Sequence, residues 1–142
     1  MEHPLDHVAI AVPSIASTLP FYELIVGAAG SAIEAVPEQG VNVVFVGSGP
    51  TRVELIEPTR PDTGVARFLE NHGPGLHHIA YRVPDLEATL AALAERGTPL
   101  IDRVPREGRH GHRIAFLHPR AAHGVLIELI EAAAKPAPDD PK

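Results

Sequence analysis

The sequence contains no cysteine and no tryptophan, and aromatic residues make up only 4% of its 142 residues. Without cysteine, the chain forms no disulfide and offers no thiolate as a nucleophile or metal ligand. The scarcity of aromatic side chains disfavours a platform on which bases or sugars stack. The chemistry of the chain therefore depends on its histidine, carboxylate and arginine side chains.

A surplus of positive charge and long apolar segments are also missing. The formal net charge is −6, which argues against nonspecific nucleic-acid binding, because such binding needs basic side chains to neutralise phosphates. No apolar run approaches the roughly 18 residues of a membrane span. The first residues lack the basic and apolar regions of a signal peptide. We therefore expect a cytoplasmic protein without nucleic-acid or membrane partners.

The chain contains an internal repeat. Residues 7–12 match residues 78–83 at an offset of 71, and residues 52–57 match residues 126–131 at an offset of 74. Each half thus carries one His on an opening strand and one Glu on a closing strand. The length and the hydrophobic content of 44% fit one compact domain or two fused small halves.

Apolar periodicity and turn residues predict the same order of elements in each half. Strands are predicted at 5–12, 30–36, 41–46, 52–56, 76–83, 98–102, 112–118 and 124–130. Helices are predicted at 15–26, 62–71 and 86–96, with N-caps at Ser14 and Asp85 and ends at Gly27 and Gly97. Pro20 allows either a kink or a late start of the first helix.

This order predicts an α+β fold. Two tandem βαβββ modules would form a curved, mostly antiparallel eight-stranded sheet with helices on the outer face. We expect the first module and a connecting helix at residues 1–72, the second module at 73–131, and a disordered, proline-rich tail at 132–142.

The repeat also predicts a metal site. Alternation along the first strand puts His7 on the inner face of the sheet. Taken alone, His7, Glu54 or Glu128 fits a solvated strand face better than a metal site. The repeat favours a site instead, because His7, Glu54, His78 and Glu128 occupy matching places in two copies. Two imidazoles and two carboxylates bind divalent ions and leave coordination positions open, which suits catalysis.

The other histidines receive different predictions. Alternation puts His77 on the face opposite His78, so we expect His77 to be structural or to support the ligands by a hydrogen bond. The remaining candidates lie near loops or strand ends and are expected to be surface or hydrogen-bonding residues: His72, His110, His112, His118 and His123.

At these positions the chain resembles the vicinal oxygen chelate superfamily, which includes glyoxalase I, and within it the methylmalonyl-CoA epimerases. The matching segments are residues 6–12, 21–22, 37–41, 75–80, 116–119 and 123–129. The resemblance implies that His7, Glu54, His78 and Glu128 are the metal ligands. In some epimerases the second ligand is Gln. This chain has Glu54 at that position, which makes its ligand set resemble that of glyoxalase I as well. At the position of Val43, some epimerases have a Glu that is regarded as a catalytic base.

The activity implied is interconversion of (2R)- and (2S)-methylmalonyl-CoA through α-proton abstraction and a metal-stabilised enolate. Inversion needs proton exchange on both faces of the α-carbon, and Glu54 and Glu128 would be the two groups that exchange the protons. Of the two, Glu128 is the stronger candidate. The alternative is a glyoxalase I-type lyase or isomerase acting on another thioester or thiol adduct. Four ligands disfavour an extradiol dioxygenase and a non-catalytic drug-binding protein.

The resemblance also implies the cofactor and the partners. Co²⁺ is expected first, with Mn²⁺, Ni²⁺, Zn²⁺ or Fe²⁺ as alternatives. The substrate is an acyl-CoA and the assembly a homodimer. Substrate contacts are expected from Gln39 and from Arg106, Arg109 and Arg113. Five of the ten arginines lie between positions 103 and 120, where they form either a basic patch for the CoA phosphates or a solvated loop.

Overall fold

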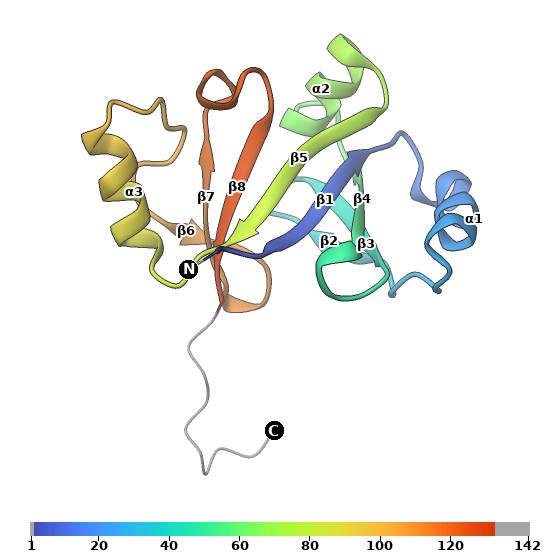
Figure 1. Cartoon of the computed structure of the whole chain (residues 1–142). Helices are drawn as coiled ribbons and strands as arrows, with labels where there is room; N and C mark the ends of the chain where they lie inside the picture. Colours follow the sequence, from blue (N-terminus) through green and yellow to red (C-terminus); the bar gives the residue numbers. More distant parts are fainter. Residues whose placement is uncertain (1, 133–142) are drawn as a thin grey trace.

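The computed structural model describes residues 2–132, in which eight strands form one curled sheet (Figure 1). The strands are β1 (Leu5–Ala11), β2 (Glu34–Val36), β3 (Val41–Val46), β4 (Val53–Pro58), β5 (Gly75–Arg82), β6 (Arg106–Glu107), β7 (Arg113–Leu117) and β8 (Leu126–Glu131). The α-helices are α1 (Ile15–Val26), α2 (Gly64–His72) and α3 (Leu86–Glu95). Three short 3₁₀ turns are η1 (Gly49–Thr51), η2 (Arg109–Gly111) and η3 (Pro119–Ala122).

The strand order is symmetric about the centre of the sheet. It runs β2-β3-β4-β1-β5-β8-β7-β6, so the opening strands β1 and β5 are neighbours. These two strands pair antiparallel, whereas β1 pairs parallel with β4 and β5 pairs parallel with β8. The remaining pairs are antiparallel. The predicted α+β fold with a curved, mostly antiparallel sheet is therefore confirmed.

The outer face of the sheet is covered by α1 and α3, which lie at its two sides (Figure 1). Ile15 of α1 is fully buried against apolar side chains of β3 and β4. Leu86 and Leu90 of α3 are buried in the same way against β7 and β8. Because strand residues alternate between faces, this packing leaves the other set of side chains on the inner face.

The helix starts follow local capping chemistry. The backbone N–H of Ser17 donates to the Ser14 hydroxyl over 3.2 Å, and that of Ala88 donates to the Asp85 carboxylate over 3.0 Å. Both predicted N-caps are confirmed. Helix α1 runs through Pro20 and ends at Gly27, whose φ of 80° is left-handed.

The strand predicted at 98–102 is wrong. Only Leu100 forms a bridge there, with Leu117. Pro99 has no N–H to donate. The carboxylate of Asp102 accepts a hydrogen bond from the backbone N–H of Phe116 over 2.8 Å. This N–H is therefore not available to a backbone carbonyl of a longer strand. The edge strand β6 forms instead in the predicted arginine-rich loop.

Most other elements differ from their predicted bounds by one or two residues at most. In the segment 30–36, only Glu34–Val36 forms a strand, and Gly30 contributes an isolated bridge to Val46. Helix α2 begins at Gly64 because the Thr63 hydroxyl caps it, accepting the N–H of Ala66 over 3.0 Å. The predicted disordered tail lies outside the described residues, except for Ala132. None of the helices within residues 2–132 has the length and apolar character to cross a membrane.

Candidate metal centre

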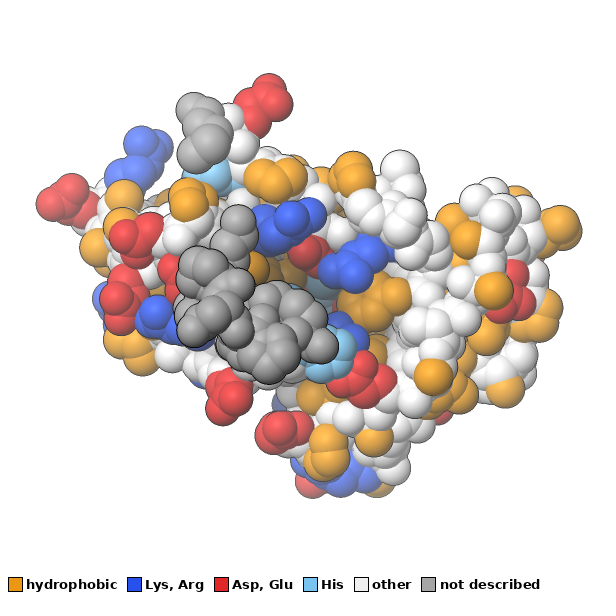
Figure 2. Space-filling view, turned by 90° about the horizontal axis from the view of Figure 1, so that it is seen from below, with side chains coloured by type: hydrophobic (Ala, Val, Ile, Leu, Met, Phe, Trp, Pro, Cys, Tyr) orange, Lys and Arg blue, Asp and Glu red, His pale blue; other side chains and the backbone are white. Residues whose placement is uncertain are grey.

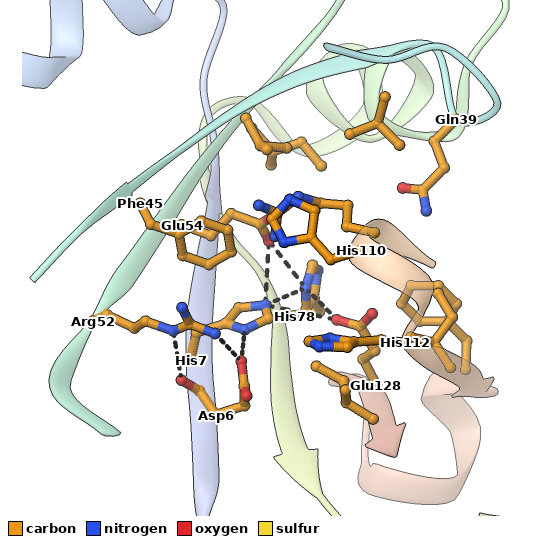
Figure 3. Close-up of a pocket in the computed structure, with 17 residues that line it drawn as sticks. Asp6, His7, Gln39, Phe45, Arg52, Glu54, His78, His110, His112 and Glu128 are labelled. Atoms are coloured by element: carbon orange, nitrogen blue, oxygen red, sulfur yellow. Dashed lines mark hydrogen bonds and ion pairs between the residues drawn. The ribbon is translucent and has the colours of Figure 1, made fainter. Parts of the chain in front are cut away.

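The inner face of the sheet forms a cavity with a polar floor and apolar walls (Figure 3). Its polar lining consists of Asp6, His7, Gln39, Arg52, Glu54, His78, Arg109, His110, His112 and Glu128. Its apolar lining consists of Val36, Val43, Phe45, Ile56, Ile114, Phe116 and Ile130. Figure 2 shows acidic, basic and His side chains gathered in the middle of the face seen from below.

The four residues singled out by the repeat converge on the floor of this cavity. His7 Nε2 lies 3.3 Å from His78 Nε2 and 3.2 Å from Glu54 Oε1. His78 Nε2 lies 3.1 Å from Glu128 Oε1. All four residues are buried. The structure thus brings them together, while their role as metal ligands stays a prediction.

Strand register explains the convergence. His7 lies opposite Ala80, and His78 lies opposite Ala9, so the two imidazoles are inward neighbours on antiparallel strands. Each Glu lies opposite a Phe on the next strand, Glu54 beside Phe45 and Glu128 beside Phe116. The same two Phe rings also pack edge-on against the imidazoles. The ring centroids of His7 and Phe45 are 5.3 Å apart, and those of His78 and Phe116 are 5.9 Å apart.

Asp6 holds the outer nitrogen of His7. The Asp6 carboxylate lies 2.7 Å from His7 Nδ1, 2.6 Å from Arg52 Nη2 and 3.1 Å from Arg82 Nε. Burial alone would raise the pKa of Asp6, but the hydrogen bonds with His7 and Arg52 outweigh it and keep that pKa well below its usual range. An ionised Asp6 accepts from Nδ1–H and leaves His7 Nε2 facing the cluster.

His77 holds the outer nitrogen of His78 in the same way. The two Nδ1 atoms are 2.9 Å apart. Burial and the neighbouring His78 lower the pKa of His77 to about 4, so a neutral His77 accepts the Nδ1–H of His78. The sequence prediction that these side chains lie on opposite faces is wrong. The register shifts at His77, and at Asp6 in the other half, so each is an extra, bulged residue.

The cluster carries a strongly negative potential. Burial would lower the pKa of His7, but hydrogen bonds with Asp6 and Glu54 raise it to about 9. Burial would raise the pKa of Glu54, but its hydrogen bond with His7 and the charge of His78 lower it. A proton held on His7 between two carboxylates occupies the position that suits a cation.

The donor set fits a divalent ion. One donor atom from each of His7, Glu54 and His78 lies within 4.8 Å of the others. Two nitrogens bound to one ion at about 2.1 Å with tetrahedral or octahedral angles are roughly 3.0–3.4 Å apart, and the two Nε2 atoms are 3.3 Å apart. Glu128 completes the set, with its Oε1 3.1 Å from His78 Nε2 and 3.6 Å from His7 Nε2.

Of the four predicted substrate-binding residues, two line the cavity and two do not. Gln39 and Arg109 line the cavity. Arg106 has its guanidinium 5.2 Å from the centre of the Phe116 ring and pairs with Asp102. Arg113 does not line this cavity; its guanidinium pairs with two carboxylates, those of Glu87 and Glu131.

Sequence reasoning gave no site role to Asp6, His110 or His112, although all three line the cavity. The bulge that turns Asp6 inward has no signature in the alternation pattern. His110 and His112 stand in the arginine-rich loop, and the density of basic residues there was the only signal that this loop faces a ligand.

Comparison with known proteins agrees with this geometry. Residues 6–116 match the model of the Glyoxalase/Bleomycin resistance protein/Dioxygenase superfamily. The chain is 49% identical to the uncharacterized protein YqjC of Bacillus subtilis, over 89% of this chain and 91% of that protein. It is 40% identical to the mitochondrial methylmalonyl-CoA epimerase of Homo sapiens, over 90% of this chain and 73% of that protein.

A solved structure has the same fold. It is a methylmalonyl-CoA epimerase in complex with methylmalonyl-CoA and NH₄⁺, with a TM-score of 0.86 and 36% sequence identity. The match covers 94% of this chain and 97% of that one. The chain therefore belongs to the Glyoxalase/Bleomycin resistance protein/Dioxygenase superfamily and, within it, to the family of the methylmalonyl-CoA epimerases.

Proposed function

We propose that this protein is a divalent-metal-dependent epimerase that interconverts (2R)- and (2S)-methylmalonyl-CoA. The observation that carries the proposal is the buried cluster of His7, Glu54, His78 and Glu128 on the cavity floor. It occurs in a chain whose relatives include methylmalonyl-CoA epimerases that match about nine-tenths of its length.

His7, Glu54, His78 and Glu128 would hold the ion, and Co²⁺ is our first choice among the divalent metals. A bound divalent ion acts as a Lewis acid that stabilises an enolate next to a thioester. We assign Glu54 to the ion alone; its Oε1 lies 3.2 Å from His7 Nε2 and 3.5 Å from His78 Nε2.

Glu128 is the group we assign to the α-proton. Its Oε1 lies 3.1 Å from His78 Nε2 and 3.6 Å from His7 Nε2. A metal-bound carboxylate can loosen and then accept a substrate proton. The apolar walls beside it, formed by Ile114 and Ile130, exclude water and strengthen the charges of the floor.

The test is proton NMR in deuterated water with methylmalonyl-CoA. Wild-type protein with added metal should exchange the α-proton and invert the centre, and chelation should stop both. Glu128→Gln keeps the shape of the side chain without its basicity, so it should retain part of its metal but lose exchange of the epimer whose α-proton faces residue 128 by about 10²–10⁴-fold.

Glu38→Gln, in the exposed turn before β3, is the matched control and should exchange at the wild-type rate. Full exchange by Glu128→Gln would contradict the role of Glu128. Absence of exchange and inversion in the wild type with every candidate metal would contradict the function itself.

A glyoxalase I-type reaction is the second candidate, favoured by Glu54 as the second carboxylate of the cluster. Conversion of a thiol adduct faster than methylmalonyl-CoA by the same metal-loaded protein would select it. The predicted homodimer and cytoplasmic location remain proposals, and light scattering on the purified chain measures the first.

A further inference from the structure

The turn η2 joins the two halves of the chain across the cavity. Arg109 Nη2 lies 2.6 Å from Glu34 Oε1, and His110 Nε2 lies 3.1 Å from Glu34 Oε2. Glu34 belongs to β2, at one edge of the sheet, whereas η2 follows β6 at the other edge. One carboxylate therefore holds two consecutive side chains that are more than seventy residues away in sequence.

Glu34 places these side chains over the first half of the cavity. It lies directly opposite Val43 on the neighbouring strand, and residues paired in this way share a face of the sheet. Val43 lines the cavity. The Arg109 guanidinium lies 4.7 Å from the centre of the Phe45 ring, which is also in the first half. His110 thus lines the cavity on the side where Val43 provides no polar group.

The backbone of His110 is adapted to this position. Its φ of 58° and ψ of 32° are left-handed, a conformation uncommon for residues other than glycine. Among residues 2–132, His123 is the only other non-glycine residue with positive φ. Strained backbone of this kind is found where the surrounding contacts fix a functional side chain.

Inversion of a carbon centre requires a proton donor or acceptor on each of its two faces. Glu128 serves one face in the function proposed above, and Glu54 is held between His7 and His78. Asp6 is committed to its ion pairs with two arginines. Two histidines remain in the cavity lining. His112 directly precedes β7, on the side of Glu128, whereas His110 is bound to the first half (Figure 3).

We infer that His110, oriented by Glu34, is the catalytic residue that exchanges a proton with the α-carbon on the face opposite Glu128. This inference rests on the proposed epimerase function. Glu34 accepts the Nε2–H of His110, which leaves the lone pair of Nδ1 for the substrate. Ion pairing with Arg109 keeps the pKa of Glu34 below its ordinary value, so the carboxylate is ionised when it orients the imidazole.

His110 and Glu128 exchange the roles of base and acid between the two directions of the reaction. Neutral His110 takes the α-proton of one epimer at Nδ1, and the electron pair of the broken C–H bond forms the enolate. Protonated Glu128 then gives its proton to the opposite face of the same carbon. The reverse reaction begins with ionised Glu128 and protonated His110. After each conversion, one group has gained a proton and the other has lost one, and exchange with water restores both.

The test separates exchange from inversion. In deuterated water with metal and each epimer of methylmalonyl-CoA, His110→Asn should lose inversion by about 100-fold or more. Exchange of the epimer whose α-proton faces Glu128 should stay within about threefold of the wild type and proceed with retention, because Glu128 alone still serves that face. Asn adopts left-handed backbone readily, so the turn is preserved.

His123→Asn makes the same change at the other left-handed histidine, outside the cavity, and should leave both rates unchanged. Inversion by His110→Asn within threefold of the wild type would overturn the inference, and so would an equal loss of exchange from both epimers. The inference would also be overturned if His112→Asn lost inversion but kept exchange of one epimer, while His110→Asn kept both rates at the wild-type level. A wild type that neither exchanges nor inverts contradicts the epimerase function instead.

Glu34→Gln tests the positioning role. It should show the same split between exchange and inversion, by about tenfold, with unchanged metal content, because the imidazole loses the carboxylate that fixes it. An equal decrease of exchange for both epimers would show that Glu34 only supports the fold.

Discussion

Each histidine of the cluster is oriented by the residue that precedes it. Neighbouring residues of a regular strand point to opposite faces, but a bulge at Asp6 and another at His77 turn these side chains toward the next imidazole. The two supports differ in charge. Asp6 is an ionised carboxylate, whereas His77 is neutral because burial lowers its pKa to about 4. The two imidazoles would therefore be inequivalent as metal ligands.

Asp6→Asn tests the charged support. The variant keeps the size of the side chain but loses the carboxylate that accepts His7 Nδ1–H and pairs with Arg52 and Arg82. We expect metal affinity to fall by about 10- to 100-fold, the usual effect of losing such a partner. Calorimetric titration of the metal-free protein measures it.

Asp62→Asn is the control for this change, because Asp62 forms an exposed ion pair with Arg60 and should bind metal like the wild type. Equal affinities of the wild type and Asp6→Asn would show that the hydrogen bond to Nδ1 does not tune the ligand.

At the scale of elements, the closing strands β4 and β8 serve both faces of the sheet. Glu54 and Glu128 point inward, and three residues later each strand carries a second Glu, Glu57 in β4 and Glu131 in β8. The backbone N–H of Ile15 donates to Glu57 Oε1 over 2.7 Å, and that of Leu86 donates to Glu131 Oε2 over 3.0 Å. A carboxylate at a helix N-terminus satisfies a free N–H and interacts favourably with the helix dipole.

Glu57→Ala should therefore destabilise the fold without affecting the metal centre. Loss of a hydrogen bond to a charged group costs about 1.5–3 kcal/mol, and Glu57 also accepts the side-chain amide of Asn42. Urea denaturation should show this decrease in the free energy of unfolding, with unchanged metal stoichiometry. Glu38→Ala, in an exposed turn, should change neither. Loss of metal binding by Glu57→Ala would mean that α1 docking positions the ligands.

The sequence predicts those elements whose determinants are local or repeated. The repeat predicts that His7 and His78 come together with two carboxylates, because duplicated strands place equivalent residues around one axis. Bulges are not visible in an alternating pattern, so the inward turn of His77 was missed. The contact between Glu34 and η2 also escaped prediction, since neither segment repeats and nothing in either one encodes its partner.

At the scale of the whole molecule, few polar side chains among residues 2–132 join the two halves beyond the backbone pairing of β1 with β5. Asp6 binds Arg52 of the first half and Arg82 of the second. Glu34 binds η2 from the opposite edge of the sheet. The cluster on the floor takes His7 from one half and His78 from the other. A cation there would link both halves at the sheet centre and would bind the native state only, because the unfolded chain does not gather these side chains.

Removal of the metal should consequently lower the thermal stability of the whole fold. A ligand that binds only the native state at 100 times its Kd stabilises it by about 2.7 kcal/mol, which corresponds to roughly 8–10 °C in Tm for a chain of this size. Calorimetry of the wild type with and without a chelator measures the shift. In His78→Ala the shift should nearly vanish, whereas His118→Ala, outside the cavity lining, should retain it. An equal response of wild type and His78→Ala to the chelator would place the stabilising ion elsewhere.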